Sequence, residues 1–163
     1  MLVRLTPLAA VLVSSAVWAL FGVASGYVAH RLPPAGLDHD NWLTRPRRFE
    51  AGGRWYERRL HISRWKDRLP EWGALFPGGT SKRQLPGRTD ADLERFAVET
   101  RRAETVHWSN LAAGPLFLVW CPPVVGAAMV AFGVLAHAPF ICIQRYNRAR
   151  IERTLTRRRN RGA

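Results

Sequence analysis

The stretch WSNLAAGPLFLVWCPPVVGAAMVAFGVLAHAPFICI, residues 108–143, contains no Lys, Arg, Asp or Glu, and Pro122-Pro123 interrupts it near the middle. After the proline pair, residues 124–143 provide the about 20 apolar residues that a helix needs to cross a bilayer core. The part before the pair is too short to cross alone, although the preceding helix can extend it. Because the segments on both sides are rich in arginine, we expect a helical hairpin that turns at the prolines. The alternative is a single crossing, with the two flanking segments on opposite sides of the membrane.

A second uncharged run, residues 5–29, predicts a transmembrane helix within residues 1–30. Its basic start and the small residues near its end also fit a secretory signal peptide. The run is longer than the about 7–15 apolar residues typical of such a peptide, and His30-Arg31 follows it like a cytoplasmic anchor. We therefore expect a retained helix, with a signal peptide as the alternative.

The charged residues are unevenly distributed and divide the chain into four regions. The N-terminal helix (1–30) is followed by a basic, Trp-rich region (31–108), the apolar hairpin (109–143) and an Arg-rich tail (144–163). The net charge is +13, and the tail alone has eight Arg against one Glu. The positive-inside rule places the tail and the basic region on the cytoplasmic side of a cell membrane. Anionic lipid head groups are favoured over nucleic acid as the partner of this charge.

Proline and glycine divide the first part of the basic region into short pieces. Only RWYERRLHISRWKDRL, residues 54–69, is long enough for a few turns of helix. Aromatic residues lie among its arginines and just beyond it: Trp55, Tyr56, Trp65 and Trp72. This composition is typical of the membrane–water boundary, so we expect an interfacial helix. A soluble helix whose arginine stems lie along its apolar side is the alternative.

A long helix is expected after this region. Thr89-Asp90 is typical of a helix N-cap, and no Pro or Gly interrupts residues 91–113. This helix contains ETRRAETVHW, residues 99–108, and enters the apolar run. The elements together predict an all-α membrane protein with an N-terminal transmembrane helix, amphipathic or interfacial helices and a C-terminal helical hairpin broken by proline.

The long helix contains an acid and an imidazole on its apolar side. At 100° per residue, Glu104 and His107 fall on the apolar face together with Phe96. Arg101 and Glu94 point away from that face. An acid three residues before an imidazole can hydrogen-bond to the ring and orient it as a base. The alternative is a structural pair in which two buried polar groups satisfy each other.

The spacing Glu-x-x-His also occurs in helical bundles that bind two metal ions. Those sites need further inward Glu and His ligands from other helices. His61 and Glu99 are the only evident candidates in this sequence. We therefore expect neither a metal site nor a cofactor.

A dense group of hydrogen-bond donors follows the apolar run: Gln144, Arg145, Tyr146, Asn147 and Arg148. A hairpin would bring this group to the same membrane face as the ETRRAETVHW segment. A charged patch of this kind at a bilayer surface suits an amphiphilic substrate. For the later run of arginines at 157–159, we expect an ordinary cytoplasmic anchor.

Three segments carry a resemblance to a known family. RWKDRLP (64–70), ETRRAETVHW (99–108) and QRYNRARI (144–151) resemble, in this order, marker segments of the glycosyl-4,4′-diaponeurosporenoate acyltransferase family. The resemblance covers roughly residues 50–151. Two positions depart from the family pattern: Ala149 stands where Pro is common, and His137 stands where Asn is common.

The resemblance implies a small bacterial membrane enzyme of carotenoid biosynthesis. The family's reaction esterifies a sugar hydroxyl of a glycosylated carotenoid acid with a fatty acyl chain. The expected partners are a fatty acyl donor and a glycosylated carotenoid, or a related glycolipid or polyprenoid. The alternative is a non-enzymatic membrane adaptor or assembly protein that binds anionic lipid or a partner enzyme.

The resemblance also implies roles for individual residues. His107, steadied by Glu104, would be the catalytic base, and Arg102, Lys66 or Arg145 would stabilise the oxyanion or bind the donor. The other residues expected to bind substrate are Glu99, Trp108, Trp65, His61, Gln144, Tyr146, Asn147 and Arg148. The sequence has no Gly-x-Ser-x-Gly motif, and Cys121 and Cys142 lie in the apolar run without an adjacent base. A direct transfer is therefore favoured over an acyl-enzyme.

Overall fold

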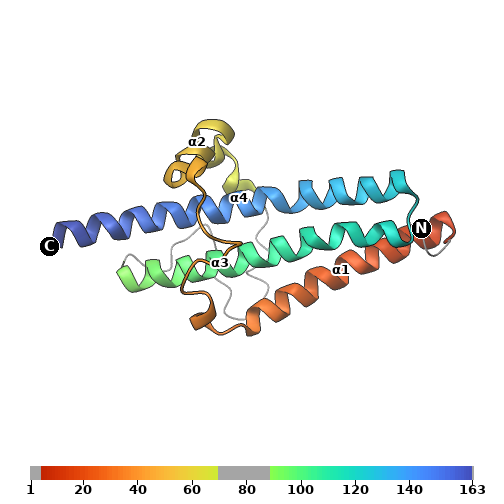
Figure 1. Cartoon of the computed structure of the whole chain (residues 1–163), viewed down its shortest axis with the longest axis horizontal. Helices are drawn as coiled ribbons and strands as arrows, with labels where there is room; N and C mark the ends of the chain where they lie inside the picture. Colours follow the sequence, from red (N-terminus) through yellow and green to blue (C-terminus); the bar gives the residue numbers. More distant parts are fainter. Residues whose placement is uncertain (1–4, 70–88, 163) are drawn as a thin grey trace. The chain divides into compact units, whose positions relative to one another are not determined.

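The computed structural model describes residues 5–69 and 89–162, which contain helices and turns and no strand (Figure 1). The α-helices are α1 (Pro7–Arg31), α2 (Arg54–Leu60), α3 (Asp90–Ala113) and α4 (Pro123–Gly162). The described residues between them also form short 3-10 helices: η1 (Pro34–Gly36), η2 (Arg48–Gly53), η3 (Ile62–Arg64), η4 (Lys66–Arg68) and η6 (Gly114–Val119). The predicted all-α fold class is confirmed.

Among the described residues, two helices, α1 and α4, are long and apolar enough to cross a membrane, a finding that concerns their length and composition alone. The start of α1 is specified locally. Thr6 accepts a hydrogen bond from the backbone N–H of Ala9 at 3.3 Å, and Pro7 occupies the first helical position, where no N–H is needed.

The helix α4 is longer than the predicted membrane span. Its 40 residues rise about 60 Å, twice the about 30 Å of a bilayer core. The Arg-rich residues 144–162 are therefore a continuation of the apolar helix. Pro139 lies inside α4 and removes one backbone donor, yet the helix continues through it.

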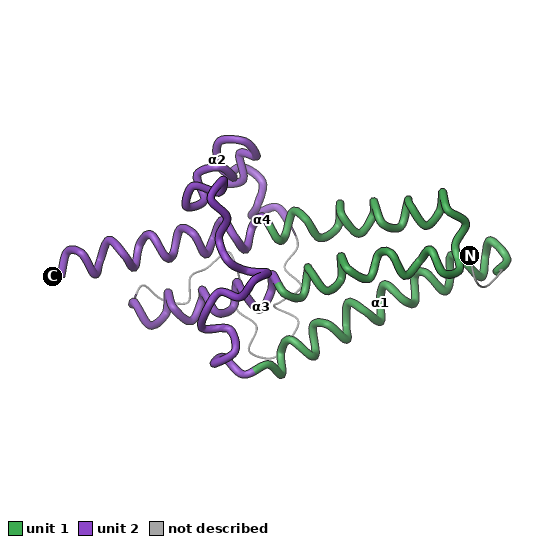
Figure 2. The backbone as a smooth tube through the Cα atoms, in the orientation of Figure 1, with its two compact units in different colours: residues 1–32, 105–141 green, residues 33–104, 142–163 purple. Residues whose placement is uncertain are grey.

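The chain divides into two compact units, coloured separately in Figure 2. Unit 1 consists of residues 1–32 and 105–141, and unit 2 of residues 33–104 and 142–163. The division cuts α3 after Glu104 and α4 after Ile141.

Unit 1 contains the predicted hairpin, packed against α1; its turn lies at residues 120–122, immediately before α4 begins at Pro123. Trp18 of α1 stacks on Phe117 with ring centroids 5.0 Å apart. Gly133 of α4 makes room for Trp18, because a Cβ at this position would lie 2.9 Å from the indole Cη2 atom. These contacts favour the retained first helix over a cleaved signal peptide, and retention stays a prediction.

Residues 54–69 of unit 2 do not form the single helix that was expected. The helix α2 has seven residues and ends where His61 adopts a left-handed conformation, with φ 47°. A left-handed residue cannot continue an α-helix, so the chain proceeds through η3 and η4 instead.

The aromatic residues of this region form part of a core. Tyr56 is buried with Ile62, Ile143 and Tyr146, and Trp55 and Trp65 pack against this cluster. Burial, followed by the negative charge of Glu50, raises the pKa of the Tyr56 hydroxyl above its usual value, so this side chain stays neutral. Trp72 of the predicted interfacial group lies outside the described residues.

The start of α3 is as expected from its sequence. The backbone N–H of Asp92 donates to Thr89 Oγ1 at 3.2 Å, and the Thr89 hydroxyl donates to the Asp92 carboxylate at 2.6 Å. Within unit 2, α3 packs against the later part of α4 through an apolar cluster of Leu93, Phe96, Ala97, Ile151 and Leu155.

Candidate active site

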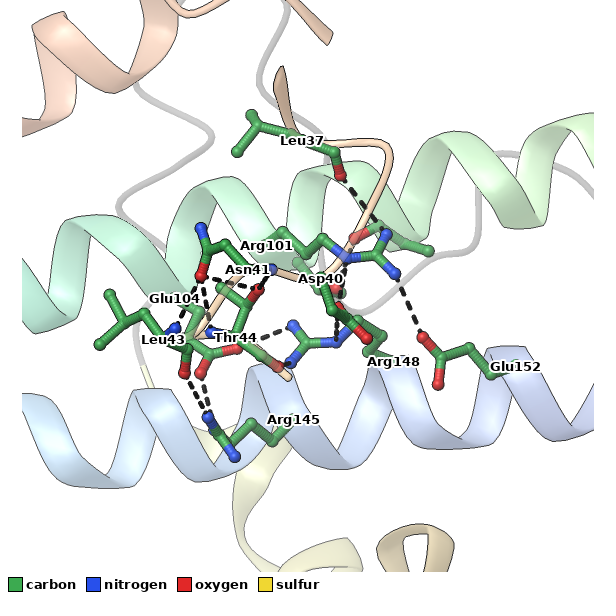
Figure 3. A network of polar contacts seen from close by, with 12 residues as sticks. Leu37, Asp40, Asn41, Leu43, Thr44, Arg101, Glu104, Arg145, Arg148 and Glu152 are labelled. Carbon is green, nitrogen blue, oxygen red and sulfur yellow. Dashed lines mark hydrogen bonds and ion pairs between the residues drawn. The ribbon is translucent and has the colours of Figure 1, made fainter. Parts of the chain in front are cut away.

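The most buried ionic contacts of unit 2 surround Glu104 of α3. This carboxylate is 0% exposed, which agrees with its predicted place on the apolar face. Arg145 Nε of α4 donates to Glu104 Oε1 at 2.6 Å, and Arg148 Nη1 lies 2.7 Å from Glu104 Oε2. Figure 3 shows both arginines reaching towards Glu104. Each carboxylate oxygen therefore has an arginine partner.

Each nitrogen of the Arg145 guanidinium has a protein partner. Besides Glu104, it donates through Nη1 to the buried carboxylate of Glu50 and through Nη2 to the carbonyl of Leu43 at 2.6 Å. Through these contacts, Arg145 connects α4 to α3 and to two places in the segment 43–50. Its role in stabilising an oxyanion stays a prediction.

The segment before η2 presents its carbonyl groups to these arginines. Asn41 Oδ1 accepts hydrogen bonds from the backbone N–H groups of Leu43 and Thr44, at 2.8 and 2.9 Å. This local turn is a common use of asparagine. The carbonyls of Leu43 and Thr44 then accept from Arg145 and Arg148 respectively.

Arg101, which the helical angles place away from the apolar face of α3, is nevertheless buried. Its side chain is buried, with Nε donating to Asp40 at 2.6 Å and Nη2 to Glu152 at 3.3 Å. The reason is the irregular segment that follows η1, which covers this side of α3 through Asp40 and the carbonyl of Leu37. Helical periodicity cannot reveal a covering segment that has no periodicity of its own.

These contacts form one set, which we call the arginine network: Asp40, Glu50, Arg101, Glu104, Arg145, Arg148 and Glu152. Buried ions cost several kcal/mol each to desolvate, so they occur only where opposite charges and hydrogen bonds compensate them. The acids and the arginines of the network satisfy this condition. The network therefore has the geometry of a structural clamp between α3, α4 and the segment 37–50.

The other residues predicted to bind substrate occupy several places in unit 2. Tyr146 donates its hydroxyl to Glu57 at 3.1 Å, and Trp65 donates its indole N–H to the carbonyl of Leu60 at 2.8 Å. Arg102 donates to Glu99 at 3.2 Å. Lys66 pairs with Asp67, His61 is exposed, and Asn147 and Gln144 are buried. In the described part of the chain, Gln144 Nε2 has no hydrogen-bond partner.

Unit 2 also has an open cavity of about 330 Å³. Its lining residues are Pro46, Glu50, Gly52, Ala149, Glu152, Arg153, Thr156 and Arg157. None of the predicted substrate-binding residues lines it. Ala149, the residue that stands where the family commonly has Pro, contributes one wall.

Unit 1 contains the predicted base, His107, in an aromatic setting. Its Nδ1 atom lies 3.2 Å from Nδ1 of His137 on α4. Phe140 stacks on the His107 ring with centroids 4.8 Å apart and planes 11° apart. Trp18 lies against His137 with ring centroids 5.7 Å apart.

His137 is the functional candidate that the sequence did not identify. It is the only histidine between Trp108 and Ile143, a run otherwise without charged residues. An ionisable side chain inside a potential membrane helix is by itself a signal of function. That signal was available, but the partner of His137 could not be chosen without the structure.

The predicted pairing of Glu104 with His107 stays a prediction. The two residues are three positions apart on α3, with Glu104 in unit 2 and His107 in unit 1. The contacts described above place Glu104 between arginines and His107 beside an imidazole. Trp108 follows His107 and is half-buried.

The fold and this histidine pair define a class: small helical proteins with two potential membrane helices and acid–base groups inside an apolar unit. Residues 39–157 match the family model described as glycosyl-4,4′-diaponeurosporenoate acyltransferase, and the chain belongs to that family. The match includes every predicted site residue and His137. The predicted family and the predicted class of enzyme, an acyltransferase, are confirmed.

Curated relatives agree with this assignment. A protein of Staphylococcus aureus (strain bovine RF122 / ET3-1) named glycosyl-4,4′-diaponeurosporenoate acyltransferase is 24% identical over 145 residues, which cover 89% of this chain and 87% of the relative. A protein of the same name from Staphylococcus aureus (strain USA300) is 27% identical over 114 residues, covering 70% of this chain and 68% of the relative. No solved structure matches the chain.

Proposed function

We propose that this protein is a membrane-bound enzyme that transfers a fatty acyl chain to a sugar hydroxyl of a glycosylated carotenoid or a related glycolipid. The observation that carries the proposal is His107, a half-buried imidazole held between aromatic and imidazole rings within the apolar unit of an acyltransferase. Imidazole is the side chain best suited to accept and return a proton near neutral pH.

In the proposed step, His107 takes the proton of the sugar hydroxyl as its oxygen attacks the carbonyl carbon of an activated acyl ester or thioester. The new ester C–O bond forms, and the bond between the acyl carbon and the donor's leaving group breaks. His107 then returns the proton to the leaving group. The step is a direct transfer and needs no oxidant, metal or covalent enzyme intermediate.

Charged residues of unit 2 are proposed to bind the polar parts of the substrates. Arg102 and Lys66 are candidates for the oxyanion or for charged groups of the donor, because cations stabilise negative charge that develops in acyl transfer. Glu104 is proposed to hold the turn of α3 that carries His107, through its ion pairs with the arginines.

The long chains of both substrates require an apolar surface, and unit 1 offers one. Its large exposed hydrophobic residues include Leu8, Leu12, Leu20, Val23, Val28, Val124, Phe132 and Leu135. Exposed apolar surface of this extent suits contact with lipid tails. We propose that α1 and the apolar part of α4 lie in the bacterial cell membrane, and that anionic lipids contact the arginines beyond it.

The orientation has its own experiment. The basic region and the end of α4 are both proposed to be cytoplasmic, because both are rich in arginine. In a background without native cysteines, His39→Cys and Gly162→Cys should react with an impermeant maleimide only after the cells are permeabilised. Labelling of one position in intact cells would exclude the hairpin orientation.

The function is tested by complementation. A strain that lacks the gene would receive wild type, His107→Ala or His39→Ala, and its lipid extracts would be compared by mass spectrometry. His39 is an exposed histidine, so its variant is the matched control. We expect His107→Ala to lower acyl-ester formation by about 10²–10⁴-fold at equal protein abundance. An unchanged acylated-lipid profile in His107→Ala would contradict the proposal.

A further inference from the structure

We infer that His137 is a positioning residue that sets the tautomer of His107, by accepting a hydrogen bond from His107 Nδ1–H. The inference rests on the proposed function, in which His107 is the base. It adds a second imidazole, from the other arm of the hairpin, that neither the family assignment nor the predicted site contains.

The contact between the two rings requires that one of the two Nδ1 atoms carries a hydrogen and that the other does not. Nδ1 of His107 and Nδ1 of His137 are 3.2 Å apart, which is a hydrogen-bond distance for two ring nitrogens. A hydrogen bond between two neutral imidazoles needs a hydrogen on one nitrogen and a lone pair on the other. With both rings neutral, the hydrogen bond therefore excludes two states, the one in which both Nδ1 atoms carry hydrogen and the one in which neither does.

The two remaining arrangements differ in their chemistry. If His137 donates, His107 uses its Nδ1 lone pair for this contact and carries its hydrogen on Nε2, so neither nitrogen can accept a substrate proton. If His107 donates, the lone pair of its ring lies on Nε2, the atom that would accept the proton of the sugar hydroxyl in the proposed step. The imidazolium that forms after proton transfer can then keep donating to His137 through Nδ1. Only the second arrangement makes His107 a base.

Aromatic packing holds both rings in place for this contact. Phe140 lies parallel to the His107 ring, and Trp18 lies against the His137 ring. Trp18 is fixed in turn by stacking on Phe117 and by the space at Gly133. The two imidazoles thus sit on helices α3 and α4 with neighbours that limit their rotation.

An imidazole acceptor also suits the apolar unit better than a carboxylate. A buried carboxylate needs compensating charges, and Glu104 has them in the arginines of unit 2. His137 accepts a hydrogen bond without adding a net charge among the apolar helices. A neutral acceptor therefore orients the base at a lower desolvation cost.

The tautomer of His107 can be measured directly, without reference to activity. The full chain, with ¹⁵N-labelled histidine, would be studied in detergent micelles by long-range ¹H–¹⁵N NMR at a pH where both rings are neutral. In the wild type we expect His107 to carry its hydrogen on Nδ1. In His137→Ala we expect the Nε2–H form that a free imidazole prefers.

The conservative variant His137→Asn tests whether another hydrogen-bond acceptor restores the tautomer of His107. In His137→Asn, the amide oxygen can accept the same hydrogen bond, so we expect His107 to keep its hydrogen on Nδ1. His39→Ala is the matched control and should leave the His107 signals unchanged. If His137→Ala does not accumulate, His137→Leu replaces it, because leucine fills the space without offering an acceptor.

Acyl-transfer rates complete the experiment. We expect His137→Ala to lower kcat roughly 10- to 100-fold with little change in KM. This loss is a part of the about 10²–10⁴-fold that a general base contributes to the rate. We expect His137→Asn to recover most of the lost kcat. A His107 tautomer that is the same in wild type and His137→Ala would overturn the inference, as would equal rates for the Asn and Ala variants. If His107→Ala is itself active, the proposed function fails, while the NMR result still decides the role of His137.

Discussion

Unit 1 and unit 2 bury polar groups in different ways. In unit 2, four acids and three arginines form the arginine network, and the two most buried members, Glu104 and Arg148, are 0% and 1% exposed. In unit 1, the polar contacts include those of Asn110 with Ser25 and of His107 with His137, which join an amide to a hydroxyl and one imidazole to another. The charges of unit 2 compensate one another, which is what a structural role requires. The imidazoles of unit 1 can exchange a proton, which the proposed chemistry requires.

The largest effect on stability is expected at Glu104, the most buried acid of unit 2. Glu104→Ala would remove the carboxylate that compensates the buried guanidiniums of Arg145 and Arg148. We therefore expect the free energy of unfolding to fall by about 3–5 kcal/mol. The measurement is denaturant unfolding of the purified chain in detergent, followed by circular dichroism. A double-mutant cycle with Arg145→Ala should give a coupling of roughly 0.5–3 kcal/mol. A cost within experimental error of zero would show that the network does not stabilise unit 2.

The next effect is expected in unit 1, at the close approach of α1 to α4. A Cβ at Gly133 would overlap Trp18, so we expect Gly133→Ala to destabilise by about 1–3 kcal/mol. Gly22→Ala is the matched control, because nothing lies within 4 Å of the Cβ it would add. The same unfolding assay applies. If both variants were equally stable, α1 would not be packed on α4 as described.

A smaller effect is expected from the surface ion pairs at the end of α4. Arg158 and Arg159 pair with Asp90 and Glu94 of α3 at 2.6 and 2.9 Å, and all four side chains are well exposed. Exposed pairs of this kind contribute about 0–1 kcal/mol. We expect Arg159→Ala to change the unfolding free energy by less than about 1 kcal/mol, in contrast to Glu104→Ala. A cost as large as that of Glu104→Ala would remove the distinction between buried and exposed pairs in unit 2.

The smallest predicted effect is a pH dependence at Glu57. The hydroxyl of Ser63, followed by that of Tyr146, donates to Glu57 and lowers the pKa of this carboxyl below its usual value. A lowered pKa in the folded state means that the contribution to stability is present above the unfolded-state pKa and is lost as pH falls through the folded-state pKa. We expect Ser63→Ala to raise the pKa of Glu57 in an NMR titration. An unchanged titration curve would show that this hydrogen bond is absent in solution.

The helices could be predicted because their signals are local. Thr89 marks the start of α3, the proline pair marks the turn of the hairpin, and the uncharged runs give the two potential membrane helices. The face of α3 that buries Glu104 followed from helical periodicity. No local signal predicted the left-handed conformation of His61. Histidine is not among the residues that dominate turns, which are Gly, Pro, Asn, Asp and Ser.

The contacts of the candidate site could be predicted only in part, because they join distant residues. Arg145 meets Glu50 across 95 positions of the chain, and His107 meets His137 across 30. A sequence pattern contains no information on such pairs unless the intervening structure is known. Arg101 shows the same limit, since its burial depends on Asp40 in a segment without periodic structure.

The most direct test of His107 as the catalytic base measures activity and stability together in one variant, His107→Gln. Acyl transfer from an activated fatty acyl thioester to a glycosylated carotenoid would be followed in purified, reconstituted protein, with thermal unfolding of the same samples. We expect a loss of about 100-fold or more in the rate with an unchanged unfolding temperature. A rate close to that of the wild type, or a loss explained by a lowered unfolding temperature, would contradict the assignment of the chemistry to His107.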